Sequence, residues 1–145
     1  MTADYYISTD KSKLDLDSIH GFLVKCYWAK GIPKETVAKS IEHSDCFGVY
    51  KDTQQVGFAR VISDYATFMY IADVYILPEH RGQGLGVELI RQIVNHSEYQ
   101  GIRTWTLLTA DAHGLYEKFD FYNLDEPKKF MSRRVKYPYE IEEIR

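Results

Sequence analysis

Three glycines within five residues follow an arginine near the middle of the chain, where residues 73–86 read DVYILPEHRGQGLG. Gly82, Gly84 and Gly86 let the backbone turn with no Cβ in the way. The first N–H groups of the helix that should follow have no intrahelical acceptor, and with the positive end of the helix dipole they form an anion site. Arg81 adds a planar cation that can bind a phosphate through two hydrogen bonds. The stretch therefore predicts a phosphate-binding loop.

Two common nucleotide-binding loops do not match this spacing. A P-loop has four residues between its glycines and then Gly-Lys-Ser/Thr, which is absent here. The Rossmann fingerprint is Gly-x-Gly-x-x-Gly after a first strand, whereas this loop is Gly-x-Gly-x-Gly and some 80 residues precede it. A tight strand-to-helix turn that binds no ligand is the remaining alternative.

Two separate segments of the chain resemble motifs of one known protein family. Residues 81–86, RGQGLG, match the Arg/Gln-x-x-Gly-x-Gly/Ala pyrophosphate loop of the GNAT superfamily, the acetyl-CoA-dependent N-acetyltransferases. Residues 73–78 match the fourth strand of that family, and residues 115–121, LYEKFDF, resemble its Leu-Tyr-x-Lys-x-Gly-Phe segment. The resemblance is good over roughly residues 45–135 and covers the first 44 only in general layout.

The resemblance implies acetyl-CoA as co-substrate. In the family the fourth strand parts from its neighbour and leaves backbone groups free for the pantetheine arm. Thr109 stands where relatives often have an asparagine, and its hydroxyl is a partial substitute. Asp120 stands where the family usually has glycine, and aspartate tolerates a positive φ there at some cost. The residues expected to bind the cofactor are Val74, Tyr75, Ile76, Arg81, Gly82, Gln83, Gly84, Leu85, Gly86 and Thr109.

Transfer of an acetyl group from a thioester to an amine needs a neutral amine, a polarised carbonyl and a protonated thiolate. A backbone N–H within residues 74–76 is expected to polarise the carbonyl, as in an oxyanion hole. Tyr116 is the expected acid, because a phenol of pKa ~10 can protonate a basic thiolate. The resemblance assigns this role to its matching tyrosine. A tyrosine that only packs on a helix face is the alternative.

Asp73 is an acid within an apolar run, and burying an unpaired carboxylate is costly. A bulge or a splay of the strand would place it beside solvent or ligand. We expect Asp73 to be the catalytic base, directly or through a water. A counter-charge for the substrate ammonium and a structural bond to neighbouring backbone are the alternatives. His113, one turn before Tyr116, is the second candidate base.

The acceptor pocket is expected to involve Tyr27, Trp28, Arg60 and His113. Tyr27 and Trp28 should end the first helix, which forms a wall of the pocket in the family. An aromatic wall with an arginine suits a small amine that also carries a carboxylate. In the alternative interpretation the aromatic residues belong to the core and rim, and Arg60 pairs with Asp64.

The apolar patterns predict one domain over residues 1–145, without repeat or linker. The resemblance implies that it is an N-acetyltransferase domain with a mixed α/β (α+β), GNAT-type fold. We expect a central mixed, mostly antiparallel sheet of about seven strands, splayed after the fourth, with helices on both faces. The expected strands cover 4–9, 46–51, 55–63, 66–77, 103–108, 119–123 and 130–135, and the expected helices 14–28, 33–43, 85–94 and 110–118.

Composition and charge exclude several classes of protein. The chain is 45% hydrophobic and 27% charged, as in ordinary globular domains. No apolar run approaches the ~20 residues of a membrane span, and no signal peptide begins the chain, so we expect a cytoplasmic protein with no membrane partner. A net charge of −3 argues against nucleic acid. Cys26 and Cys46 show no metal-binding spacing, so no metal is expected.

Three functional hypotheses follow from these patterns. The first is an N-acetyltransferase that acts on a primary amine of a small molecule. The second is a protein or peptide N-acetyltransferase, which would need an open groove. The third is a non-catalytic sensor that binds acetyl-CoA, which would have no need of an acid at Tyr116. The apolar C-terminal strand makes a homodimer a further expectation.

Overall fold

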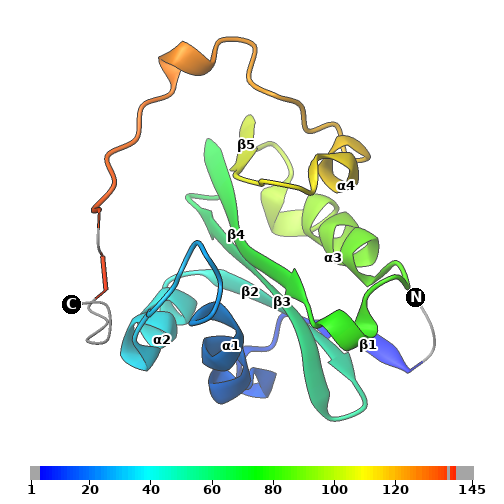
Figure 1. Ribbon diagram of the computed structural model, residues 1–145. Coiled ribbons are helices and arrows are strands. Elements are labelled where there is room, and N and C mark those ends of the chain that lie inside the picture. Colours follow the sequence, from blue (N-terminus) through cyan, green and yellow to red (C-terminus); the bar gives the residue numbers. More distant parts are fainter. Residues whose placement is uncertain (1–3, 137, 140–145) are drawn as a thin grey trace.

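The computed structural model describes residues 4–136, 138 and 139, and the chain forms one five-stranded sheet with four α-helices (Figure 1). The strands are β1 (Tyr5–Ser8), β2 (Asp45–Lys51), β3 (Gln54–Ser63), β4 (Phe68–Ile76) and β5 (Thr104–Leu107). The helices are α1 (Leu16–Leu23), α2 (Lys34–Glu42), α3 (Leu85–Val94) and α4 (His113–Glu117), with 3-10 turns η1 (Lys11–Lys13), η2 (Pro78–His80), η3 (Ser97–Tyr99) and η4 (Pro127–Lys129).

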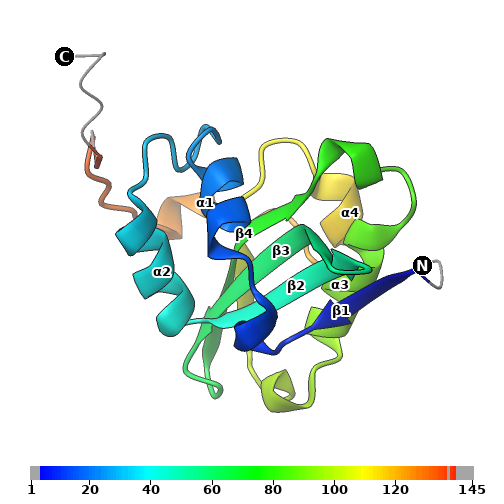
Figure 2. The ribbon, with the colours of Figure 1, turned by 90° about the horizontal axis from the view of Figure 1, so that it is seen from below.

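The strands lie in the order β1-β2-β3-β4-β5. The first three pairings are antiparallel and are seen side by side in Figure 2, whereas β5 runs parallel to β4. The mixed sheet is confirmed. The expectation of about seven strands is wrong for the described residues, because 119–123 and 130–135 form no strand. A β-rich sequence becomes a strand only where it finds a neighbour to pair with, and every residue from 122 to 136 is exposed.

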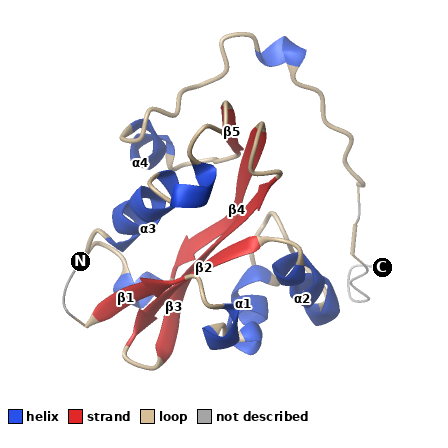
Figure 3. Ribbon diagram, turned by 180° about the vertical axis from the view of Figure 1, so that it is seen from behind, coloured by secondary structure: helices blue, strands red, loops and turns tan. Residues whose placement is uncertain are grey.

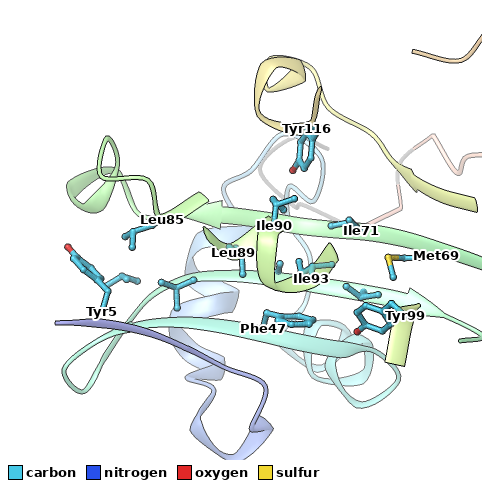
Figure 4. Packing of buried hydrophobic residues seen from close by; sticks show 14 of the residues in the cluster. Tyr5, Phe47, Met69, Ile71, Leu85, Leu89, Ile90, Ile93, Tyr99 and Tyr116 are labelled. Carbon is cyan, nitrogen blue, oxygen red and sulfur yellow. The ribbon is translucent and has the colours of Figure 1, made fainter. Parts of the chain in front are cut away.

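Helices cover both faces of the sheet, and each face has its own apolar core. On one face α3 contributes Leu85, Leu89, Ile90 and Ile93, which pack with strand residues such as Phe47 and Ile71 (Figure 4). On the other face α1 contributes Ile19 and Leu23, and α2 contributes Val37. The 3.6-residue spacing of these side chains is the pattern that predicted the helices.

Helix α1 is shorter than the predicted 14–28. It begins after Asp15, whose carboxylate accepts a hydrogen bond from the Ser18 N–H, and it ends at Leu23. The chain then turns tightly to Gly31, which has φ of 81° and donates its N–H to Val24 O at 3.0 Å. A glycine in the left-handed region is a common way to satisfy the last carbonyls of a helix. Tyr27 and Trp28 therefore lie in the turn after α1 and not on the helix.

No helix within the described part of the chain is both long and apolar enough to cross a membrane.

Candidate active site

The glycine loop between β4 and α3 has the backbone that the sequence predicts. Gly82 and Gly84 have φ of 79° and 80°, and Gly84 is the N-cap of α3. No side chain caps this helix. The N–H groups of its first turn therefore point to the loop without an intrahelical acceptor. The positive end of the α3 dipole and these N–H groups form an anion site.

Side chains from β1 and η2 hold the loop in place. The Tyr5 hydroxyl is hydrogen-bonded to His80 Nδ1 at 2.8 Å and accepts from Gln83 Nε2 at 3.2 Å. Tyr5 is buried on β1, some 75 residues before His80 in the sequence. Sequence reasoning missed both Tyr5 and His80, since no local pattern signals a contact between residues so far apart.

The strand before the loop has an open edge where β4 and β5 part. Residues Phe68–Ile71 of β4 pair with Thr104–Leu107 of β5, and β4 then continues to Ile76 without a β5 partner. This is the splay that was expected after the fourth strand. It opens directly beside the glycine loop.

Backbone alternation shows which groups face this opening. Leu77 N–H donates to Val56 O at 2.8 Å, so the N–H and C=O of Ile76 point away from β3. The same alternation turns the Tyr75 N–H toward β3. Arg81 Nε donates to the outward Ile76 O at 2.8 Å, which places the guanidinium between the open edge and the loop. Of the three predicted positions 74–76, Ile76 therefore offers its amide to the opening most clearly.

Asp73 lies at a β-bulge. It has φ of 55°, and residues 73 and 74 together oppose Ala59 on β3, where the register shifts. The bulge predicted from an acid in an apolar strand is confirmed. Aspartate is one of the few non-glycine residues that adopt this backbone readily.

Three of the predicted site residues meet in one polar network. Asp73 Oδ1 accepts from Trp28 Nε1 at 2.9 Å, and Asp73 Oδ2 accepts from Arg60 Nε at 2.9 Å. The Arg60 and Asp73 side chains are only 16% and 12% exposed. Arg60 Nη1 also donates to Ser44 Oγ at 3.0 Å, and Ser44 Oγ donates to Ser40 O at 2.6 Å. Ser44, which directly precedes β2, gave no signal in the sequence.

The alternative pairing of Arg60 with Asp64 is wrong. Asp64 instead accepts hydrogen bonds from the N–H groups of Ala66, Thr67 and Phe68 and from the Thr67 hydroxyl. These bonds shape the turn between β3 and β4. A short polar side chain that bonds backbone two or three residues ahead is a common turn former.

The turn after α1 forms the rim of the network. Tyr27 is 76% exposed and meets Trp28 edge to face at 5.2 Å between ring centroids. Nearby, burial and, to a smaller extent, the negative charge of Asp73 raise the pKa of the Cys26 thiol, which therefore stays protonated. Tyr75 packs its ring on Phe22 at 3.9 Å, so it contributes its side chain to the α1 core and not to the opening.

Tyr116 lies on α4 at the edge of the core beneath α3. It is 7% exposed and belongs to the same apolar cluster as Ile71, the last β4 residue paired with β5. Figure 4 shows its ring beside Ile90, with the hydroxyl directed away from α4 and toward the sheet. Burial, with a smaller effect of Asp111, raises the pKa of Tyr116 to about 12. The phenol is thus a proton donor at neutral pH.

This burial predicts a late ionisation of Tyr116. A raised pKa means that the folded state favours the protonated phenol, so this contribution to stability is complete below the unfolded pKa of ~10 and is lost as pH rises through about 12. Subtracting the ultraviolet titration of Tyr116→Phe from that of the wild type should isolate a phenolate step near pH 12. A step at the ordinary value of a solvated tyrosine would contradict the burial.

Three other predicted positions lie around α4. Thr109 Oγ1 accepts a hydrogen bond from the Ala112 N–H at 3.0 Å, and this bond shapes the turn that leads into α4. His113 begins α4 and is exposed. Asp120 has φ of 68°, which confirms that aspartate replaces glycine at a position of positive φ.

A separate cavity of about 240 Å³ lies at the start of β2, lined in part by Asp45, Tyr65, His96 and Tyr99. The hydroxyls of Tyr65 and Tyr99 both donate to the Asp45 carboxylate at 2.6 Å. These polar groups satisfy one another. None of the residues predicted for the site lines this cavity.

Over the residues that the structure describes, no group of three His, Cys, Asp or Glu side chains is placed to hold a metal ion.

Comparison with known proteins decides the family. A family model described as an acetyltransferase (GNAT) domain matches residues 42–123, which include the bulge, the splay, the glycine loop and Tyr116. The chain belongs to the GNAT acetyltransferase family. A relative from Gibberella zeae, described as an acetyltransferase, is 36% identical over 138 residues, which cover 79% of this chain and 77% of the relative.

A solved structure and a further relative extend this result. A crystal structure from Xanthomonas campestris, described as an acetyltransferase of the GNAT family, is 45% identical, with a TM-score of 0.92 over 97% of this chain and 100% of that one. A thialysine N-epsilon-acetyltransferase of Mus musculus is 28% identical over 87 residues, 54% of this chain and 51% of the relative.

Proposed function

We propose that this GNAT protein is an N-acetyltransferase that moves an acetyl group from acetyl-CoA to a primary amine of a small molecule. The observation that carries the proposal is the meeting of two features at one end of β4. The glycine loop offers N–H groups at the start of α3, and the open edge of β4 begins beside it. An anion site next to an unpaired strand edge fits a molecule with a diphosphate and an amide-containing arm.

The residues of the loop fit a coenzyme A diphosphate. Gly82 and Gly84 hold left-handed φ values that leave the N–H groups of residues 82–86 facing the anion. Arg81 is exposed and reaches the open edge through Ile76 O. Its guanidinium can exchange this carbonyl for two phosphate oxygens. When bound, acetyl-CoA supplies the acetyl group as an activated thioester.

Tyr116 is the proposed general acid. A phenol is protonated at neutral pH, and burial raises the pKa of Tyr116 further, to about 12. No hydrogen bond from its hydroxyl to another group is found in the described part of the chain. The hydroxyl is therefore available to donate its proton to the departing sulfur. The amide of Ile76, which faces the opening, is the proposed donor to the carbonyl oxygen.

Asp73 is proposed as a counter-charge that positions the substrate ammonium. Each of its oxygens already accepts one hydrogen bond, from Trp28 or from Arg60. A carboxylate oxygen has a second lone pair, so an ammonium can still bind. Because both oxygens of Asp73 already accept a hydrogen bond from the protein, we assign removal of the amine proton to a water at this site.

A lysine-like small molecule is the class of acceptor that we favour. The relative from Mus musculus is named for an ε-amine of a small amino acid, and Tyr27 and Trp28 form an aromatic rim beside the Asp73 carboxylate. An aromatic face next to a carboxylate favours a cationic amine.

The test is release of free thiol from acetyl-CoA across a panel of amines that includes lysine analogues, polyamines and a lysine-containing peptide. The proposal predicts turnover with at least one small amine. Turnover with the peptide alone would favour a protein acetyltransferase. Tight binding of acetyl-CoA without turnover of any amine would favour a sensor.

Gly84, the N-cap of α3, and Gly86, in the first turn of this helix, give a matched pair of variants. Gly84→Val puts a β-branched residue at φ of 80°, a strain of about 1–3 kcal/mol, and we expect binding of acetyl-CoA to weaken at least tenfold. A Cβ at Gly86 would meet Leu115 Cδ2 at an ordinary 3.8 Å, so Gly86→Ala should stay within about threefold of the wild type. Calorimetric titration measures both. Equal affinities for the two variants would show that the Gly84 backbone plays no part in binding.

A further inference from the structure

The cavity at the start of β2 lies on the face of the sheet that α3 covers. Its lining includes Phe47 and Tyr99, which belong to the core beneath α3 (Figure 4). Arg60 alternates along β3 with two residues that point into that core, so its side chain points to the opposite face. Figure 3 shows α3 and α4 on one side of the sheet and α1 and α2 on the other. The sheet therefore separates this cavity from the network of Arg60 and Asp73.

Three aromatic rings and an imidazole line the cavity. Tyr99 is fully buried, stacks on His96 with 4.7 Å between ring centroids, and lies nearly parallel to Tyr65 at 6.2 Å. Phe47 meets His96 edge to face at 5.8 Å. Tyr65 is 48% exposed, so its ring forms the wall between the cavity and solvent. The π-electrons of such rings attract a cation that reaches a ring face.

The Asp45 carboxylate and two phenols form a cluster of hydrogen-bond acceptors in the cavity. Tyr65 donates its hydroxyl to one carboxylate oxygen and Tyr99 donates to the other, both at 2.6 Å. The hydrogen bond to Asp45 raises the pKa of Tyr65 to about 12, and burial with the second bond raises the pKa of Tyr99, so both phenols stay protonated. Each carboxylate oxygen and each phenol oxygen keeps a lone pair. The cluster therefore has no proton left to donate and still has places to accept one.

The negative charge of this cluster has no cation beside it within the described chain. No lysine, arginine or histidine among those residues forms an ion pair with Asp45. Glu98 also lines the cavity, and its charge acts on the Tyr65 hydroxyl. Two carboxylates without a paired cation give the cavity a negative potential, which attracts a positively charged ligand.

The two basic side chains that line the cavity do not cancel this potential. Lys11 donates its Nζ to the carbonyl oxygen of Glu42, the last residue of α2, at 3.3 Å. A lysine in this position compensates the negative end of the helix dipole. His96 Nδ1 accepts a hydrogen bond from the Glu98 N–H at 3.2 Å, so this nitrogen carries no proton and the imidazole is neutral.

The outer wall of the cavity is held in an unfavourable backbone conformation. Tyr65 has φ of 62°, which a bulky side chain rarely adopts. Its hydrogen bond to Asp45 and its stacking on Tyr99 keep the ring in place despite this strain. Strain of this kind is more frequent at ligand sites than elsewhere, which agrees with a ring that is positioned to contact a ligand.

We propose that this cavity is a second ligand site, independent of the proposed acetyl transfer, and that it binds a small primary ammonium ion. An ammonium group brings three N–H donors and a positive charge to a cluster that offers acceptors and negative charge. Its alkyl chain packs on the rings. A volume of about 240 Å³ holds about eight groups of the ~30 Å³ that a water molecule occupies in the liquid. A short alkylammonium such as butylammonium therefore fits.

The first test is an amide nuclear magnetic resonance titration of the full chain with butylammonium, without acetyl-CoA. We expect saturable shifts at residues 45–47, 65 and 96–99, with a Kd of about 1 mM or below. Shifts at residues 28, 60 and 73 report the proposed acceptor pocket and are fitted separately, so either site can fail without the other.

Three related probes identify which property of butylammonium the cavity recognises. Butanol and butyrate keep the alkyl chain without the cation and should give no saturable shifts at the cavity. Tetramethylammonium keeps the charge without an N–H donor and should bind at least about tenfold more weakly. No saturation by butylammonium at the cavity, or equal binding of butanol, would overturn the proposal.

The second test uses variants of the cavity wall. Asp45→Asn removes the charge and should weaken butylammonium binding at the cavity at least about tenfold, whereas Asp52→Asn, in the exposed turn at the other end of β2, should bind like the wild type. Tyr65→Asn removes the ring, tolerates the positive φ and keeps the buried bond of Tyr99 to Asp45, so it should stay folded and show the same loss. Wild-type affinity at the cavity in Tyr65→Asn, or in a folded Asp45→Asn, would contradict the proposal.

Discussion

Replacing Tyr116 by phenylalanine should lower kcat by about 10²–10⁴-fold and leave the KM for acetyl-CoA nearly unchanged. Tyr116 is 7% exposed and packs edge to face on Phe121. Phenylalanine keeps this ring contact and loses only the proton that we assign to the leaving sulfur. Steady-state kinetics with the best amine of the panel measures the effect.

The control for Tyr116→Phe is Tyr122→Phe, because Tyr122 is a tyrosine only six positions later but is 76% exposed. We expect its kcat to equal that of the wild type. If Tyr116→Phe also matched the wild type on a good substrate, another group would have to supply the proton. If instead its kcat fell together with its melting temperature, the hydroxyl would be structural.

Asp73→Asn should destabilise the fold by about 2 kcal/mol and raise the KM for the amine. Asparagine tolerates the positive φ of this position, so the backbone of the bulge is kept. The change removes the counter-charge of Arg60, whose side chain is only 16% exposed. The positive charge of the Arg60 guanidinium is then left mostly buried without its negatively charged partner. Urea unfolding measures the free energy, and amine titration measures KM.

Two further variants separate the stability that comes from the Arg60–Asp73 side-chain contact from any effect of the positive φ at residue 73. Asp52 also has a positive φ, of 53°, but is exposed in the turn between β2 and β3, so Asp52→Asn should change stability by less than about 0.5 kcal/mol. Arg60→Met/Asp73→Asn should be less destabilised than the sum of its single variants, because the orphaned charge is gone. Strict additivity would mean that the two side chains do not stabilise one another.

The sequence predicted those parts of the site that depend on local backbone rules. The glycine loop, the bulge at Asp73 and the positive φ of Asp120 each follow from residue types within a few positions. The partners of Asp73 did not follow. Trp28 lies 45 residues away in the chain and Arg60 lies 13 away, and only the folded sheet brings them together.

The same distinction explains the errors in the fold. The helix predicted over 14–28 is interrupted because the turn after Leu23 carries Trp28 to Asp73, a tertiary contact that periodicity does not record. The segment 130–135 has the composition of a strand, but within the described part of the chain it pairs with no other strand.

The central claim is that main-chain amides of residues 82–86 and the open edge at Ile76 bind acetyl-CoA. The most direct measurement is an amide nuclear magnetic resonance titration of the full chain with acetyl-CoA. We predict saturable shifts that are largest for residues 82–87 and for 74–76. Saturation with shifts elsewhere, for example around the cavity at Asp45 and Tyr65, or no shifts at all, would contradict it.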